Sequence, residues 1–133
     1  MNLLDENFPK DQVPLLKEWH IPFRRIGQDL ARLGVKDPDI VPLLHRNRGA
    51  TFFTLDWDFF DATLSHPAYC LVWLDVRADD AAHFLRRFLK HPRFTTQAQR
   101  MGVVARAHHE GIDFWQRNHA ALQHARWVRA TME

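Results

Sequence analysis

Three acidic pairs, far apart along the chain, have residue types and positions that suit metal chemistry. They are Asp5 with Glu6, Asp37 with Asp39, and Asp56 with Asp58. Clustered carboxylates repel one another and raise each other's pKa unless a cation is supplied. Hard oxygen ligands favour Mg²⁺ or Mn²⁺ over zinc, and such an ion can activate water and hold a phosphate oxygen. The chemistry that these residues indicate is phosphodiester hydrolysis.

The elements that must position these acids follow from apolar runs that alternate with helical patterns. We expect strands at Asn2–Leu4, Ile21–Ile26, Ala50–Leu55 and Tyr69–Leu74. We expect helices from about Asp11 to Trp19, from Asp37 as the N-cap, and over Ala81–Leu89 with Asp79 or Asp80 as the cap, besides a short helical turn at Phe59–Leu64. Strands that alternate with helices predict an α/β fold with a mainly parallel sheet.

This topology is expected to bring the acids together at one edge of the sheet. Ligands of open parallel sheets bind outside the carboxyl ends of the strands. Asp5 follows the first strand, Asp56 follows the third, and the helix that begins at Asp37 must start on the same edge. Each acid also has a purely structural interpretation, because aspartates commonly cap helices. Asp58, for example, is placed to cap the turn at Phe59.

The last third of the chain leaves two alternatives open. Val103–Ala107 and Ile112–Trp115 flank the segment HHEG and are typical of a hairpin that closes the sheet edge. A helix over Gln97–His108 fits nearly as well, and Ala120–Ala125 is expected to be helical.

Composition places the chain among single-domain globular proteins. It has 133 residues, and no apolar run is long enough to span a membrane. The segment MNLLDEN lacks the features of a secretory signal, and the single cysteine, Cys70, fits a reducing compartment, so we expect a cytoplasmic protein. Homo-oligomers are compatible with these features.

Basic residues are the expected contacts for a polyanion. The chain up to residue 67 is slightly acidic, and the remainder is basic and rich in arginine. Arginine suits bidentate phosphate contact, although a solvated helix face is its commoner setting. The residues that could contact phosphates are Arg24, Arg25, Arg46 and Arg48, and also the group of Arg86, Arg87, Lys90 and Arg93. One exposed ring among the five tryptophans could also stack on a base.

The histidines raise the alternative of a zinc site. His108, His109, His119 and His124 have no cysteine partners and do not form an HExxH motif. We therefore interpret them as residues of a solvated turn.

Taken in order, three segments resemble the compact PIN-like domains. LLDENFP, KDPDIVPLL and TFFTLDWDF match the order and spacing of that family across roughly residues 2–89, and HEGIDFW is similar to its closing strand. The resemblance implies one PIN-like domain over residues 1–133, with a three-layer α/β/α sandwich. It also implies a ribonuclease that needs Mg²⁺ or Mn²⁺, acts on RNA, and frequently serves as the toxin of a toxin–antitoxin pair with a small antitoxin protein.

The resemblance also assigns roles to individual acids. Asp5, Asp37, Asp56 and Asp58 match the metal-site carboxylates, and Glu6 and Asp39 match supporting positions. The chain departs from the family in having Trp57 between two aspartates and only Asp75 as a carboxylate directly after YCLVWL.

Two other functions are compatible with the same acids. One is a catalytically silent PIN-like module that binds without cleaving. The other is a phosphoacceptor receiver domain, in which Asp56 would take the phosphoryl group; that class needs a lysine after the fifth strand, and the sequence offers no convincing one.

Overall fold

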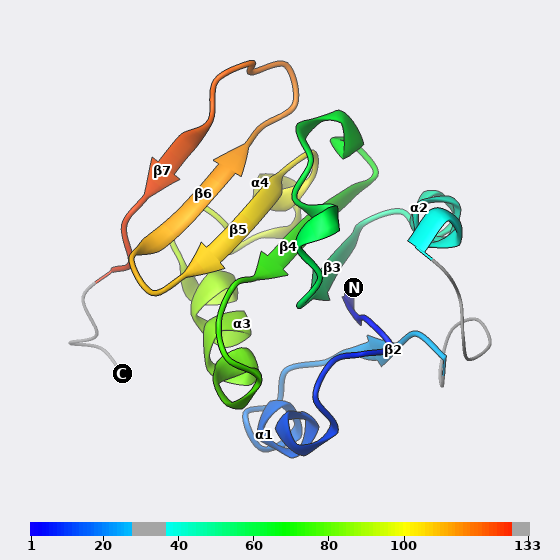
Figure 1. Ribbon diagram of the computed structural model, residues 1–133, viewed down its shortest axis with the longest axis vertical. Coiled ribbons are helices and arrows are strands. Elements are labelled where there is room, and N and C mark those ends of the chain that lie inside the picture. The colour runs from blue at the N-terminus through cyan, green and yellow to red at the C-terminus, as the bar shows by residue number, and fades with distance from the viewer. Residues whose placement is uncertain (28–36, 129–133) are drawn as a thin grey trace.

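The computed structural model describes residues 1–27 and 37–128, without the side chains of Asp37 and Pro38. In this part of the chain one seven-stranded sheet has the strand order β2-β1-β3-β4-β5-β6-β7 (Figure 1). The strands are β1 (Asn2–Leu4), β2 (Arg24–Arg25), β3 (Ala50–Thr54), β4 (Tyr69–Leu74), β5 (Val104–His108), β6 (Gly111–Trp115) and β7 (Gln123–Ala125). The pairs from β2 to β5 are parallel, and β6 and β7 add antiparallel pairs. The expected α/β fold with a mainly parallel sheet is confirmed.

Short helical segments connect these strands. The α-helices are α1 (Val13–Glu18), α2 (Asp37–Arg46), α3 (Ala81–Lys90) and α4 (Gln97–Arg100). The 3₁₀ turns are η1 (Lys10–Gln12), η2 (Trp57–Phe59), η3 (Ala62–Leu64) and η4 (Ala78–Asp80). Among the described residues, no helix is both long enough and apolar enough to cross a membrane.

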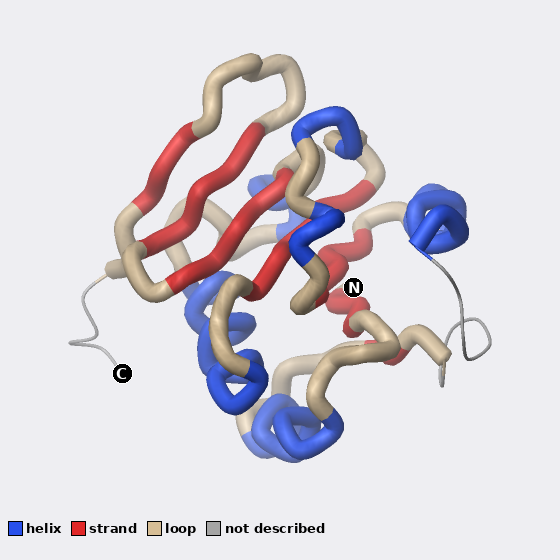
Figure 2. Tube along the Cα trace, viewed as in Figure 1, coloured by secondary structure: helices blue, strands red, loops and turns tan. Residues whose placement is uncertain are grey.

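Alternate residues of the central strands feed two apolar clusters, one on each face of the sheet. Leu4 and Phe53 pack with α1 and α3, whereas Leu3 and Phe52 pack with α2 and η2. Successive side chains of a strand point to opposite faces, so a strand buried on both sides is apolar throughout. Figure 2 shows the helices, in blue, packed around the sheet, whose strands are red.

Contrary to the sequence prediction, the first turn of α3 is not capped by the side chain of Asp79 or Asp80. Asp80 occupies the N-cap position, but its side chain makes no capping hydrogen bond. Instead the Ala82 N–H donates to Gln12 Oε1 at 3.1 Å, in a buried contact between η1 and α3. The amide of Gln12 reaches this N–H because α1 and α3 pack on the same face of the sheet.

The last third of the chain resolves the open alternatives. The hairpin is confirmed as β5 and β6, and the helix over residues 97–108 is wrong beyond the four residues of α4. The expected helix at 120–125 is also wrong, because Gln123–Ala125 forms β7, pairs with β6 and takes the sheet edge in place of the hairpin. Ala125 pairs with Ile112 and is buried, so tertiary pairing overrides the helical propensity of this alanine-rich segment.

Three local predictions also shift in extent. The strand expected over residues 21–26 is restricted to Arg24–Arg25. The first helix divides into η1, which follows Pro9, and α1. The helical turn expected over 59–64 divides into η2 and η3.

Candidate functional site

Thr54, the last residue of β3, links two of the predicted acids. Its side chain is fully buried, and its hydroxyl donates to Asp5 Oδ2 at 2.7 Å. The hydroxyl oxygen of Thr54 in turn accepts a hydrogen bond from the backbone N–H of Asp56 at 3.0 Å. Asp5 follows β1, which pairs with β3 in parallel, and the Asp5 N–H donates to the Phe53 carbonyl. The parallel register therefore places Asp5 and Asp56 together at the carboxyl ends of neighbouring strands.

The surroundings of Asp5 disfavour its charged form. Burial is the largest influence and raises the pKa of Asp5. The hydrogen bond from Thr54 and the backbone N–H groups of Glu6 and Asn7 oppose this shift, and the negative charge of Asp56 adds to it. The net pKa is raised, because the effect of burial outweighs these hydrogen bonds.

Asp56 and Asp58 have different roles in the turn that follows β3. Asp56 is the N-cap of η2, and its Oδ1 accepts the N–H of Asp58 at 2.9 Å. The prediction that Asp58 caps this turn is therefore wrong. Asp58 and Trp57 are exposed, with Trp57 having 68% of its surface accessible. One Asp56 oxygen stabilises the turn, and the half-buried side chain lies beside Asp5.

The other acids proposed for the site are Glu6, Asp37 and Asp39. Glu6 is half-buried next to Asp5, and its backbone N–H acts on the Asp5 carboxylate. Asp39 is exposed in the first turn of α2. Asp37 is the first residue of that helix. Its side chain lies outside the described part of the structure, so the prediction that it binds a metal is not tested.

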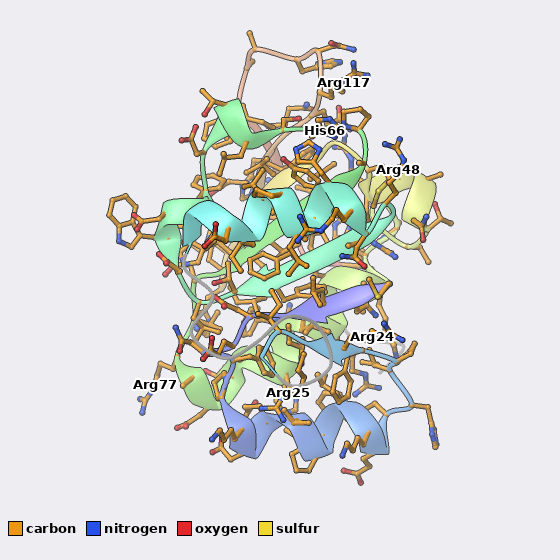
Figure 3. The ribbon with its side chains drawn as sticks, turned by 90° about the vertical axis from the view of Figure 1, so that its right-hand side faces the viewer. Arg24, Arg25, Arg48, His66, Arg77 and Arg117 are labelled. Carbon is orange, nitrogen blue, oxygen red and sulfur yellow. The ribbon has the colours of Figure 1, made fainter. Side chains whose placement is uncertain are left out.

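Four of the arginines that could contact phosphates lie at opposite ends of the sheet strands. Arg24 and Arg25 form β2, and Arg25 pairs with Leu4, one position before Asp5 (Figure 3). Arg46 ends α2 and Arg48 precedes β3, so both lie near the amino end of β3, whereas Asp56 follows its carboxyl end. Figure 3 shows Arg48 and Arg117 near His66. Burial is the main influence that lowers the pKa of His66, and the positive charges of His45, Arg48 and Arg117 lower it further.

Asp75, the acid that follows β4, is already neutralised. Arg106 Nη2 lies 2.7 Å from Asp75 Oδ2, and Nε of the same arginine donates to that oxygen at 2.8 Å. Arg106 also lies over the ring of Trp73. The acidic pair at the carboxyl ends of the strands is therefore Asp5 and Asp56, which follow β1 and β3.

A second polar cluster was missed by the sequence interpretation. His108, which ends β5, and His124 of β7 both approach Asp113 of β6, so these two histidines do not belong to a solvated turn. Burial alone would raise the pKa of Asp113, but the hydrogen bond to His124 and the charges of both histidines lower it overall. His109 and His119 are exposed. Only the three-strand register brings this set together, and no sequence spacing reports it.

The Asp5 and Asp56 pair provides oxygen ligands for a hard divalent cation. A bound cation would remove their mutual repulsion and favour the ionised form of Asp5. Glu6 and Asp58 are the nearest further carboxylates along the chain. No family model, characterised protein or solved structure matches this chain.

Proposed function

We propose that this protein is a three-layer PIN-like endoribonuclease that depends on Mg²⁺ or Mn²⁺ and acts as the toxin of a toxin–antitoxin pair. The observation that carries the proposal is the pair formed by Asp5 and Asp56, which the buried hydroxyl of Thr54 links at the ends of two parallel strands. A structural role alone accounts for one Asp56 oxygen, which caps η2, but does not account for a second carboxylate placed beside it.

The carboxylates of Asp5 and Asp56 would hold the cation, with Asp37 and Asp58 as further ligands. The bound ion supplies an activated water and a positive charge for the phosphate oxygens of RNA. Thr54 fixes the Asp5 carboxylate, and the η2 cap fixes Asp56, so both acids are positioned before the substrate arrives. Such preorganisation matters because a small displacement of a catalytic group costs roughly 100-fold in rate.

The neighbouring surface suits single-stranded RNA. Trp57 lies between Asp56 and Asp58 in the sequence, and its ring is exposed. Stacking of a base on an aromatic ring does not depend on the RNA sequence. Arg25, at the carboxyl end of β2, places a positive charge on the other side of Asp5. Trp57→Ala should therefore weaken RNA binding more than it changes the rate of cleavage at saturating RNA.

The direct test is cleavage of a fluorescently labelled single-stranded RNA by the purified protein. We expect cutting with Mn²⁺ and its loss with EDTA. Asp5→Asn and Asp56→Asn should each reduce the rate by roughly 100-fold or more, because either change displaces the ion. Asp79→Asn is the matched control, since this aspartate is 75% exposed and pairs only loosely with the exposed Arg77.

The two aspartate variants should still bind RNA, because they lose negative charge and keep their arginines. A wild-type protein that binds RNA but cleaves none with either ion would refute the nuclease and support the silent binding module. Labelling of Asp56 by a small phosphodonor would instead support the receiver domain. Growth arrest on expression of the wild type, absent with Asp56→Asn and relieved by a co-expressed small partner, would support the toxin assignment.

A further inference from the structure

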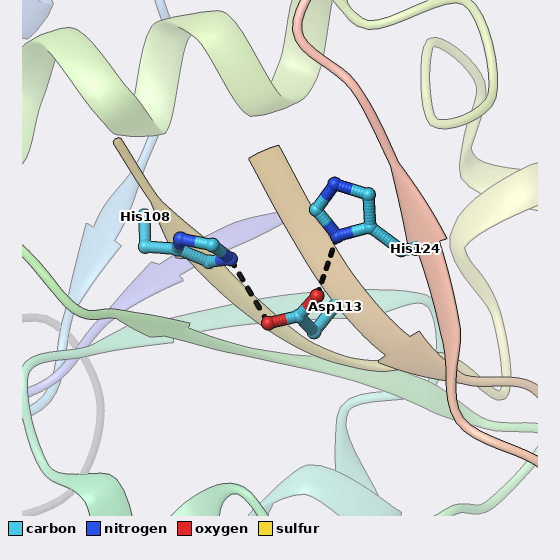
Figure 4. A group of neighbouring side chains, drawn as sticks. All are labelled: His108, Asp113 and His124. Carbon is cyan, nitrogen blue, oxygen red and sulfur yellow. Dashed lines mark hydrogen bonds and ion pairs between the residues drawn. The ribbon is translucent and has the colours of Figure 1, made fainter. Parts of the chain in front are cut away.

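The imidazoles of His108 and His124 lie on either side of the Asp113 carboxylate (Figure 4). His108 Nε2 is 2.9 Å from Asp113 Oδ2, and His124 Nδ1 is 2.6 Å from Asp113 Oδ1. These nitrogen and carboxylate ligand atoms all fall within 4.8 Å of one another. Although His108 Nε2 is buried and close to the carboxylate, its direction does not satisfy hydrogen-bond geometry with any described group.

The sheet register holds this group in place. Asp113 pairs with Arg106 on one side and with His124 on the other, so these side chains share one face. His108 lies two residues after Arg106 and therefore points to the same face. Gly111 makes room for the second imidazole, because a Cβ on this residue would lie 2.9 Å from His124 Cε1 and 3.0 Å from His124 Nε2.

We propose that His108, Asp113 and His124 form a binding site for a zinc-type transition-metal ion. Two imidazoles and one carboxylate are a common ligand set for zinc, whereas Mg²⁺ prefers oxygen ligands only. Tetrahedral zinc, with ligands about 2.0–2.2 Å away, needs ligand atoms about 3.3 Å from one another. The contacts of 2.9 and 2.6 Å must lengthen by about 0.4 and 0.7 Å, and the two imidazole nitrogens, which lie within 4.8 Å of each other, must reach a similar spacing; side-chain rotations can provide both changes.

The burial of the three side chains fits a site that is open on one side. The exposed fractions of the side chains are 14% for His108, 18% for Asp113 and 46% for His124. The more exposed His124 leaves an approach from solvent, so water can occupy the fourth position of the ion. Three protein ligands and one water form the usual arrangement of an open zinc site.

Arg106 competes for Asp113 but does not block the site. Its Nη1 lies 3.3 Å from Asp113 Oδ2, whereas its Nε and Nη2 make the shorter contacts of 2.8 and 2.7 Å to Asp75. An ion can therefore replace the longer contact while Arg106 stays on Asp75.

Metal binding also requires that each imidazole is neutral and carries its proton on the nitrogen away from the ion. His124 would bind through Nδ1 and hold its proton on Nε2. His108 would bind through Nε2 and hold its proton on Nδ1, replacing a long contact of 3.4 Å from the Glu110 N–H. That contact exceeds the usual hydrogen-bond range, so losing it has little cost.

This site is distinct from the acidic pair. The strands nearest to each other in the two sites are β3, which Asp56 follows, and β5, which His108 ends; they are two strand spacings apart, which corresponds to roughly 10 Å. The two sites also differ in their donor atoms. Failure of one proposal therefore leaves the other intact, because zinc or cobalt tests the histidine site and Mg²⁺ or Mn²⁺ with RNA tests the acidic pair.

The test is titration of the full chain, first stripped with EDTA and dialysed, with Co²⁺ and with Zn²⁺. We expect one equivalent of Co²⁺ to give the visible bands of a tetrahedral ion, Zn²⁺ to abolish those bands, and Mg²⁺ to have no effect on them. His124→Ala and Asp113→Asn should each weaken Zn²⁺ binding by roughly 100-fold or more, because loss of a direct ligand exceeds the loss of an outer group. His124 is half-exposed on an edge strand, so its variant should fold normally, which circular dichroism checks.

Two control variants locate the ion. His119→Ala removes an exposed imidazole from the same segment and should leave Zn²⁺ binding unchanged. His66→Ala tests the other close imidazole pair, in which the ring centroids of His45 and His66 are 4.2 Å apart. Absence of cobalt bands in the wild type, or bands that are lost with His66→Ala and kept with His124→Ala, would overturn the proposal.

Discussion

Thr54→Val should separate the two halves of the acidic site without leaving a cavity, because the new methyl group takes the place of the hydroxyl. The change removes the donor to Asp5 Oδ2 and the acceptor for the Asp56 N–H. A hydrogen bond to a charged group contributes about 1.5–3 kcal/mol and a neutral one about 0.5–1.5 kcal/mol. We therefore expect the free energy of unfolding at pH 7 to fall by about 2–4 kcal/mol.

Urea denaturation at pH 7 measures this loss, with Thr54→Ser as the matched control. Serine keeps the hydroxyl and loses one methyl group, so it should cost only about 1 kcal/mol. Thr54→Val should also raise the pKa of Asp5 further, because the hydrogen bond that opposes the effect of burial is gone; carboxyl-carbon NMR titration reports this shift. Equal stability of the valine and serine variants, with an unchanged Asp5 titration, would refute the role assigned to Thr54.

Two further changes test the same physical reasoning. Burial holds the pKa of Asp5 above its ordinary value of 3.8, so the contribution of Asp5 to stability should fall as the pH rises from 3.8 through the raised pKa, and Asp5→Asn should be the more stable protein at neutral pH. Denaturation curves of both proteins check the sign: the stability of the wild type minus that of Asp5→Asn should fall across this range, and a difference that rises there would contradict it. Gly111→Ala should lower the free energy of unfolding by more than about 1 kcal/mol and weaken Zn²⁺ binding, because φ is +141° and the new Cβ would lie 2.4 Å from the Ala125 carbonyl oxygen. Thermal melts and a Zn²⁺ titration check this change, and a variant with wild-type stability and affinity would count against both the strain and the packing of His124.

The sequence alone predicts the elements whose signals are local. The apolar runs of β3 and β4 and the capping pattern at the start of α2 each depend on residues within a few positions, so both the type and the approximate bounds of these elements are predictable. The position of Asp5 and Asp56 at one sheet edge also follows, because parallel strands present their carboxyl ends together.

Tertiary structure decides the features that depend on which strands become neighbours. Nothing near Thr54 in the sequence indicates that its hydroxyl joins Asp5 to Asp56, or that Arg48 lies at the opposite edge from both acids. The strand at β7 and the approach of His124 to Asp113 depend in the same way on pairing with β6. These contacts depend on the register of the sheet and on the burial of Ala125. Both are properties of the folded chain as a whole, so a short stretch of sequence does not predict them.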